Sequence, residues 1–259
     1  MADGAAAALP EEPQAGAATG ARPAYYAASP GGWRDWWTLL HPPYTAWHLS
    51  YVVIGAALAP RISLTPLLAT LIAFFLAVGL AAHALDELNG RPLRTRIPAS
   101  ALVAVAVVGL AGAVALGAAA VARDDWALVP FMIVGPLLVV AYNAELFGGI
   151  IHTDLGFAAA WGAFPVLTAY TAQTGRLALA PVLAAMAALA MSAAQRRLST
   201  PARMLRRRSV RVEGSVTLAD GQVTAVNQQA LLAPLEGALR AMSWSLVLLA
   251  ASLAFARLG

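Results

Sequence analysis

Seven long apolar runs dominate this sequence. A helix needs about 20 largely apolar residues to cross the hydrocarbon layer of a bilayer, which is about 30 Å thick, because each residue rises about 1.5 Å. Runs of about this length lie at residues 44–60, 64–85, 98–121, 126–142, 155–173, 177–194 and 231–256. The sequence therefore predicts an all-α fold, a polytopic membrane bundle of about seven transmembrane helices.

Composition agrees with a membrane protein and excludes several kinds of chemistry. Of the 259 residues, 60% are hydrophobic and 12% are charged, whereas soluble domains average roughly 45–50% and about 25%. Cysteine is absent, which excludes disulfides, thiolate zinc sites and cysteine nucleophiles. All 17 basic residues are arginine, so lysine-based catalysis and phosphate binding by lysine are excluded as well.

The arginines also predict how the chain is oriented. The connections after the second and sixth runs contain ten arginines, and the connections after the first, third and fifth contain three. Because arginine accumulates on the cytoplasmic side of membrane proteins, the even connections and the N-terminus are predicted to be cytoplasmic, in the plasma membrane. This topological role explains the net charge of +4 without nucleic acid, and no nucleic-acid partner is predicted.

The chain before the first run has two parts. Residues 1–30 are rich in Ala, Gly and Pro, which predicts a disordered tail. The following segment, residues 31–43, contains Trp33, Trp36 and Trp37. Such rings favour a short segment at the level of the lipid headgroups, although they would also suit a helix end packed by aromatics.

Residues 44–259 are predicted to form the membrane domain, with one long cytoplasmic loop at 195–230. Within that loop, residues 210–226 alternate β-branched and polar side chains around Asp220-Gly221. A two-residue turn of this kind between alternating segments indicates a β-hairpin. The hairpin would either cover the cytoplasmic mouth of the bundle or form a solvated loop.

If the even connections share one face, three polar segments converge there. The first, residues 82–98, places Asp86 and Glu87 at the end of the second run, and Arg91 and Arg94 follow them. Carboxylates are ligands for Mg²⁺, and guanidinium groups bind phosphate oxygens. The alternative is a helix end whose charges simply reach the membrane surface.

The second and third polar segments are more ambiguous. Residues 142–154 run from Tyr142 through glycines to Asp154, which would act either as a helix N-cap or, with the helix end, at a diphosphate. Residues 195–208 contain Arg196 and other arginines without a carboxylate. That segment is either an anion-attracting patch or a topology signal.

The chain resembles the UbiA-type superfamily of intramembrane prenyltransferases, and within it the branch that prenylates 1,4-dihydroxy-2-naphthoate. Residues 142–175 resemble the loop and fifth helix of the family, with an Asp after a Gly-rich turn and a Tyr-x-x-Gln-Thr-Gly ending at 170–175. The His-Pro-Pro-Tyr motif at 41–44 resembles the family's opening helix. The similarity covers about residues 38–195.

This resemblance implies a polyprenyl diphosphate substrate held through Mg²⁺ by two Asp-rich motifs, followed by attack of an electron-rich ring on the ionised prenyl group. The first motif falls on Ala82, His83, Asp86 and Gly90, so only Asp86 keeps a carboxylate. The second falls on residues 195–200, where no Asp remains. Arginine would then supply charge that the metal supplies in the family.

The resemblance also implies roles for single residues. Asp86 and Asp154 would be catalytic, Asp86 and Glu87 would hold Mg²⁺, and the diphosphate would be bound by Arg91, Arg94, Tyr142 and Arg196. The predicted function is that of a divergent prenyltransferase, which transfers an isoprenoid chain to an aromatic or other lipid-soluble acceptor within the membrane lipid.

Two other readings stay open. In the first, the chain is a catalytically inactive UbiA-like protein that binds an isoprenoid lipid, a quinone-like molecule or a partner protein. In the second, His83 and His152 join Asp86, Glu87 or Asp154 in a transition-metal site. A further set of residues, Trp161, Phe164 and Tyr170, is spaced along one helix to line a prenyl tunnel or to pack the core.

Overall fold

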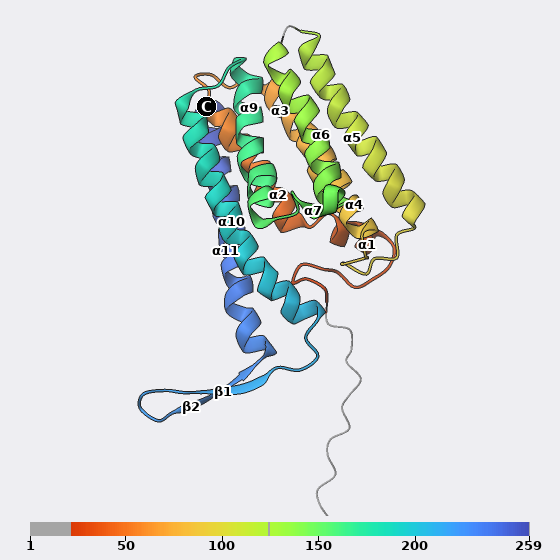
Figure 1. Ribbon diagram of the computed structural model, residues 1–259. Helices are drawn as coiled ribbons and strands as arrows, with labels where there is room; N and C mark the ends of the chain where they lie inside the picture. Colours follow the sequence, from red (N-terminus) through yellow and green to blue (C-terminus); the bar gives the residue numbers. More distant parts are fainter. Residues whose placement is uncertain (1–21, 124, 259) are drawn as a thin grey trace, which may run out of the picture.

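The computed structural model of the protein describes residues 22–123 and 125–258. It is a bundle of helices, with a small β-hairpin beyond one end and the C-terminus at the other (Figure 1). In chain order the elements are α1 (Trp33–Leu39), α2 (Pro42–Ala57), α3 (Leu64–Phe74), η1 (Phe75–Ala82), α4 (His83–Leu88), α5 (Ala99–Val121), η2 (Trp126–Leu128), α6 (Val129–Asn143), α7 (Leu146–Gly149), α8 (Asp154–Ala158), η3 (Ala159–Ala163), α9 (Phe164–Thr174), α10 (Leu179–Arg207), β1 (Glu213–Thr217), β2 (Val223–Asn227) and α11 (Gln228–Leu258).

Six helical segments of the described chain are long and apolar enough to cross a membrane. They are Leu64–Leu88, Ala99–Val121, Trp126–Asn143, Asp154–Thr174, Leu179–Arg207 and Gln228–Leu258. The helical membrane bundle is therefore confirmed, while the predicted count of seven is not. The first expected span is α2, which has 16 residues and is shorter than the others.

Two of these six segments contain a stretch of wider, π-helical winding. The segment Leu64–Leu88 includes the π-helix η1, and the segment Asp154–Thr174 includes the π-helix η3. The α4 helix ends at Leu88, and Gly90, two residues farther on, has a φ of 86° that glycine adopts without strain. π-helical turns inside α-helices often mark functional sites, and both η1 and η3 border the cavities described below.

The short α2 helix is packed inside the bundle, between α9 and α11. Its buried Tyr51 hydroxyl donates to the carbonyl oxygen of Ala188 on α10 at 3.2 Å and accepts from Ser192 at the same distance. Gly55 lets the backbones of α2 and α9 approach closely, because a Cβ at this position would lie 2.3 Å from the carbonyl oxygen of Val166. Small residues at such contacts are typical of membrane helices.

We expect Gly55→Ala to lower the thermal denaturation midpoint of the detergent-purified protein by several degrees. The added methyl group would force α2 away from Val166, at a cost of about 1–3 kcal/mol. Gly237→Ala on α11 is the matched control, because nothing lies within 4 Å of its Cβ position and alanine favours helix. An equal loss in both variants would contradict the proposed close packing.

The two longest helices, α10 and α11, carry the hairpin away from the bundle (Figure 1). They contain 29 and 31 residues, and at about 1.5 Å per residue both exceed the thickness of the hydrocarbon layer. Their extensions lead into β1 and β2, which pair antiparallel from Glu213–Asn227 to Thr217–Val223. Gly221, with φ of 84°, sits in the turn, so the predicted hairpin is confirmed.

The structure corrects the expected extent of the long loop and of the tail. Residues 195–207 are not loop but continue α10, because arginine, leucine, methionine and alanine all favour helix. Part of the predicted disordered tail is packed: Ala24 and Ala27 are buried, and the amide of Ala28 donates to Thr38 Oγ1. Residues 1–21 lie outside the described part of the chain.

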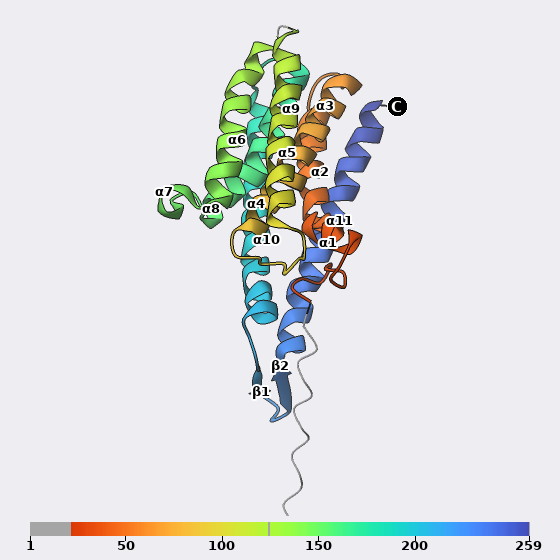
Figure 2. The same ribbon diagram turned by 90° about the vertical axis from the view of Figure 1, so that its right-hand side faces the viewer.

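The α1 helix lies at the same end of the bundle as α4, α7 and the hairpin (Figure 2). Its three tryptophans are exposed, with Trp33 showing 71% of its surface. Asp35 is buried instead, and it accepts hydrogen bonds from the amides of Gly31 and Arg96, each at 3.0 Å. The exposed rings on a firmly held helix fit the predicted position at the level of the headgroups.

Candidate functional site

The three polar segments do meet at one end of the bundle. They line a polar cavity of about 520 Å³ together with residues from α2, η1, α8 and η3. The first segment contributes Asp86 and Asn89, and the second contributes Tyr142 and His152. The third contributes one face of α10. The predicted convergence is therefore present in the fold.

Positive charge dominates the wall of this polar cavity. Among the described residues, four arginines line it, namely Arg196, Arg203, Arg207 and Arg208, and only two carboxylates do, those of Asp86 and Glu145. Three of the arginines come from α10, where intervals of seven and four residues place Arg196, Arg203 and Arg207 on one helical face. An excess of guanidinium groups in a cavity favours an anionic ligand with several oxygens.

These arginines differ in how much of their binding capacity is used inside the protein. Arg196 Nε donates to Asp154 Oδ1 at 2.9 Å, and its guanidinium lies 5.3 Å from the centre of the Phe157 ring. Arg203 donates to Thr200 Oγ1 at 3.3 Å, and Arg207 donates to the carbonyl oxygen of Pro23 at 3.1 Å. Within the described chain neither Arg203 nor Arg207 forms a salt bridge, so both retain donors for a ligand.

Several buried polar atoms on the same wall have no partner among the described residues. They are His41 Nε2, the Tyr142 hydroxyl and Gln195 Oε1. Most buried polar groups in proteins form hydrogen bonds, because leaving one unpaired costs about 1–3 kcal/mol. Three such atoms around one cavity indicate that a polar ligand or water completes their hydrogen bonds.

The surroundings of His41 favour the neutral form of its ring. Its Nδ1 lies 2.7 Å from the Tyr26 hydroxyl, and its ring stacks on His83 with centroids 4.3 Å apart. Burial, followed by the repulsion of His83 and of the Arg207 and Arg203 charges, holds the pKa of His41 well below its usual value. The ring is therefore neutral at pH 7 and is a hydrogen-bonding group of the cavity, not a cation.

Several residues that the resemblance assigned to metal and diphosphate lie away from the polar cavity. Glu87 is fully buried, and its carboxylate accepts from the amides of Leu93 and Thr95, each at 2.9 Å, and from Thr95 Oγ1 at 2.8 Å. Arg91 Nη1 donates to the carbonyl oxygen of Ile97 at 2.6 Å. Both side chains hold the connection between α4 and α5 in shape.

Arg94 and Asp154 are also outside the wall of the polar cavity. Arg94 is exposed on the α4–α5 connection, at φ of 56°. Asp154 is the first residue of α8, whose N-cap is Thr153, because Thr153 Oγ1 accepts from the amide of Gly156 at 3.0 Å. Asp154 therefore acts on the cavity through its ion pair with Arg196 and is not the helix cap.

The donor set of the polar cavity does not fit a metal held by protein carboxylates. Among the described residues there is no group of three or more His, Asp or Glu side chains arranged to hold a metal ion. Asp86 and Glu145 are the carboxylates of the wall, and both Glu87 oxygens are already hydrogen-bonded. His83 and His152 share the wall without forming such a group, so the predicted Mg²⁺ and transition-metal sites find no support in the geometry.

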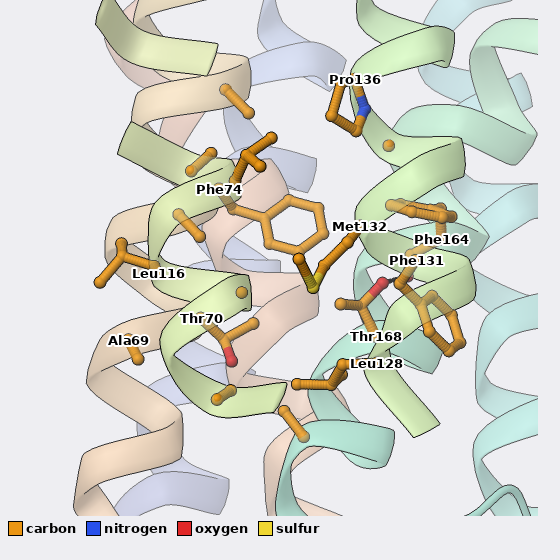
Figure 3. Close-up of a pocket in the computed structure, with 18 of the residues that line it drawn as sticks. Ala69, Thr70, Phe74, Leu116, Leu128, Phe131, Met132, Pro136, Phe164 and Thr168 are labelled. Carbon is orange, nitrogen blue, oxygen red and sulfur yellow. Dashed lines mark hydrogen bonds between the residues drawn. The ribbon is translucent and has the colours of Figure 1, made fainter. Parts of the chain in front are cut away.

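A second, apolar cavity of about 530 Å³ lies deeper in the bundle (Figure 3). It is lined by α3 with η1, by α5, by α6 and by η3 with α9. Phe74, Met132 and Phe164 project into it, and small residues of α3 and α5 make the remaining room. Trp161 and Phe164 line this cavity, whereas Tyr170 is buried elsewhere in the core.

The two cavities meet at two side chains, Val78 and Trp161, which line both of them. Val78 is part of the π-helix η1, and Trp161 is part of the π-helix η3. The backbone carbonyl of Trp161 accepts from His48 Nδ1 at 2.9 Å, and its ring meets the Tyr142 ring edge-on at 5.9 Å between centroids. The junction between the polar and the apolar cavity is thus held by aromatic packing and a buried hydrogen bond.

The sequence placed Arg203 and Arg207 in a segment that was either an anion-attracting patch or a topology signal, and it did not indicate the neutral His41 as a site residue. The arginines could have been grouped from their spacing, but this spacing places them on one helical face only when α10 continues past residue 194.

No protein-family model, no curated protein and no solved structure matches this chain.

Proposed function

We propose that this protein binds an isoprenoid diphosphate and transfers its chain to an aromatic or other lipid-soluble acceptor in the membrane. The observation that carries the proposal is the adjacency of a cationic cavity and an apolar one, which share Val78 and Trp161 in their walls. An isoprenoid diphosphate has the same division, with a charged head at one end of an apolar chain. This function agrees with the resemblance of the sequence to UbiA-type prenyltransferases.

In this arrangement the diphosphate lies among the α10 arginines, and the first carbon of the chain lies at the junction. Arg203 and Arg207 have donors free of carboxylates, and Arg196 is oriented by Asp154. Cleavage of the bond between the first carbon and the diphosphate oxygen leaves its electron pair on the diphosphate. Fixed cations that meet this developing charge lower the barrier of the step.

The acceptor then forms its new bond to the first carbon of the prenyl chain. The rings of Trp161 and Tyr142 border the junction, and aromatic faces attract a cationic carbon. An aromatic acceptor loses one proton when its ring regains aromaticity, and Asp86 is a carboxylate of the same wall. We assign the uptake of this proton to Asp86.

Turnover on detergent-purified protein tests this function. Radiolabelled geranylgeranyl diphosphate and a mixture of aromatic acceptors are incubated with the protein, with Mg²⁺ and with excess EDTA. We expect prenylated product in both arms, because arginines surround the head and the carboxylate set does not fit a metal. We expect Asp86→Asn to reduce turnover at least tenfold while leaving binding of the diphosphate within threefold.

The outcome that contradicts this assignment is product that appears only with Mg²⁺. That result would restore the metal implied by the resemblance and would make Asp86 its ligand. Glu145→Gln is the matched control, because Glu145 is the other carboxylate of the wall and has no role in the proposed step. An equal loss of turnover in both variants would argue that net charge matters, not a proton acceptor at Asp86.

A second candidate function is binding of an isoprenoid lipid or quinone without turnover. The poverty of the cavity in carboxylates favours this candidate, because departure of the diphosphate with help from a metal would need carboxylate ligands. The same variants separate the two functions. Suppose that the natural protein binds the prenyl diphosphate and releases it unchanged, whichever acceptor is offered. This result would favour lipid binding without turnover.

A further inference from the structure

We infer that the apolar cavity accepts an isoprenoid chain of three or four isoprene units and excludes the much longer polyprenyl chains. This inference rests on the proposed function, which places the diphosphate in the polar cavity. It adds the length of the chain, which follows from the dimensions and the ends of the apolar cavity.

The length of the cavity can be read along the helices that line it. On α3 and η1 the lining residues run from Thr65 to Val78, and on α6 they are preceded by Leu128 of η2 and end at Val139. At about 1.5 Å per residue, these stretches of thirteen and eleven steps correspond to roughly 17–20 Å along the bundle. The chain would enter this space at Val78 and Trp161.

The far end of the apolar cavity is bounded by polar groups. Thr65, Arg123 and Asp125 line it there, where the connection between α5 and α6 crosses the end of the bundle. An apolar chain that extended farther would meet the two charged side chains and the membrane surface. On the sides, the lining elements contact one another: α3 contacts α5 and α9, α5 contacts α6, and α6 contacts η3.

The length of an isoprenoid chain can be compared with this space. An extended chain advances about 1.2 Å per backbone bond, so that an isoprene unit, which adds four such bonds, covers about 5 Å. Roughly 17–20 Å therefore accommodates three or four units. A chain of eight units would have to leave the cavity between helices that are in contact, or push them apart.

Competition binding in lipid nanodiscs tests the chain length without requiring turnover. Radiolabelled geranylgeranyl diphosphate, which has four units, is displaced by unlabelled diphosphates of two, three, four and eight units. We expect the eight-unit competitor to bind at least tenfold more weakly than the four-unit one. An eight-unit competitor that binds equally well or better would overturn the inference and leave the proposed function standing.

The result that would reject the proposed function differs from the result that would reject only the chain length. If none of the four diphosphates displaces the label above the level of inorganic diphosphate, the proposed function fails, and the chain-length inference fails with it. A diazirine on the terminal unit of the four-unit probe gives an independent reading in the natural protein. Its crosslinks are expected near Thr65 and Leu128; crosslinks confined to lipid-facing residues such as Leu68 would overturn the inference.

A variant that shortens the cavity provides the sharpest comparison. Ala69 lines the cavity about 13 Å from Val78 along the helix, beyond the reach of a two-unit chain. We expect Ala69→Phe to weaken binding of the four-unit diphosphate about tenfold and to leave the two-unit diphosphate within twofold. Leu68→Phe, next to it on the exposed face of α3, is expected to change neither.

Discussion

An Arg203→Gln variant is expected to bind geranylgeranyl diphosphate between about tenfold and a hundredfold more weakly than the natural protein. A hydrogen bond between a charged donor and an anionic acceptor contributes about 1.5–3 kcal/mol, and each 1.4 kcal/mol corresponds to a factor of about ten in affinity. Arg203 forms no salt bridge within the described chain, so its charge is available to the ligand. Binding is measured in nanodiscs with radiolabelled diphosphate.

The double variant Arg203→Gln with Arg207→Gln is expected to bind geranylgeranyl diphosphate about a thousandfold more weakly than the natural protein. Two guanidinium groups of one helical face are then removed from the same wall. Neither arginine pairs with a carboxylate of the described chain, so the folded protein should tolerate their loss. An unchanged denaturation midpoint in both variants would show that the lost binding does not reflect unfolding.

Arg94→Gln is the matched control for this series. It removes the same charge at the same end of the bundle, but Arg94 is exposed and does not line the polar cavity. We expect binding within twofold of the natural protein. A loss at Arg94 as large as that at Arg203 would support the assignment that the resemblance gives, and would show that the cavity on α10 is not the diphosphate site.

The sequence could not reveal the α10 arginines as a group because hydropathy marks where a membrane span ends and not where a helix ends. The apolar run stops at residue 194, and the charges after it were interpreted as a loop. In the structure α10 continues to Arg207. Only that continuation brings Arg203 and Arg207 onto the face of Arg196 and Gln195, within the polar cavity.

The neighbouring carboxylates of Asp86 and Glu87 show a second limit of what can be predicted from the sequence. Asp86 and Glu87 were both predicted to hold a metal, yet adjacent residues on a helix point about 100° apart. The structure places Asp86 on the wall of the cavity and Glu87 against the α4–α5 connection. The sequence predicted correctly that the polar segments converge, but not which side chain of each segment faces the others.

The apolar cavity was the feature that was hardest to predict from the sequence. Its room comes from small residues on facing helices, such as Ala69 and Ala73 on α3 and Ala113 on α5. Alanine and glycine occur throughout the membrane spans, and small residues serve close helix packing at least as often as they leave space. Gly55 illustrates the opposite outcome, because α2 and α9 use it for direct contact.

Glu87→Ala is expected to have the largest effect on stability. The substitution would leave the buried amides of Leu93 and Thr95 without their acceptor, at about 1–3 kcal/mol for each. Together with the void, we expect a loss of about 3–5 kcal/mol of unfolding free energy, which corresponds to a fall of roughly 10 °C in the denaturation midpoint for a chain of this size. Thermal denaturation in detergent measures the change.

The same experiment separates a structural role of Glu87 from the metal-binding role that the resemblance implies. Glu213→Ala is the control, since Glu213 is an exposed carboxylate of the hairpin and its loss should change stability by less than about 0.5 kcal/mol. A metal ligand at the cavity would behave differently from a buried anchor: Glu87→Ala would keep its denaturation midpoint and lose Mg²⁺-dependent turnover. We expect the reverse, because the three hydrogen bonds of Glu87 shape the connection from α4 to α5, and Arg96 of that connection in turn donates to Asp35 and holds α1.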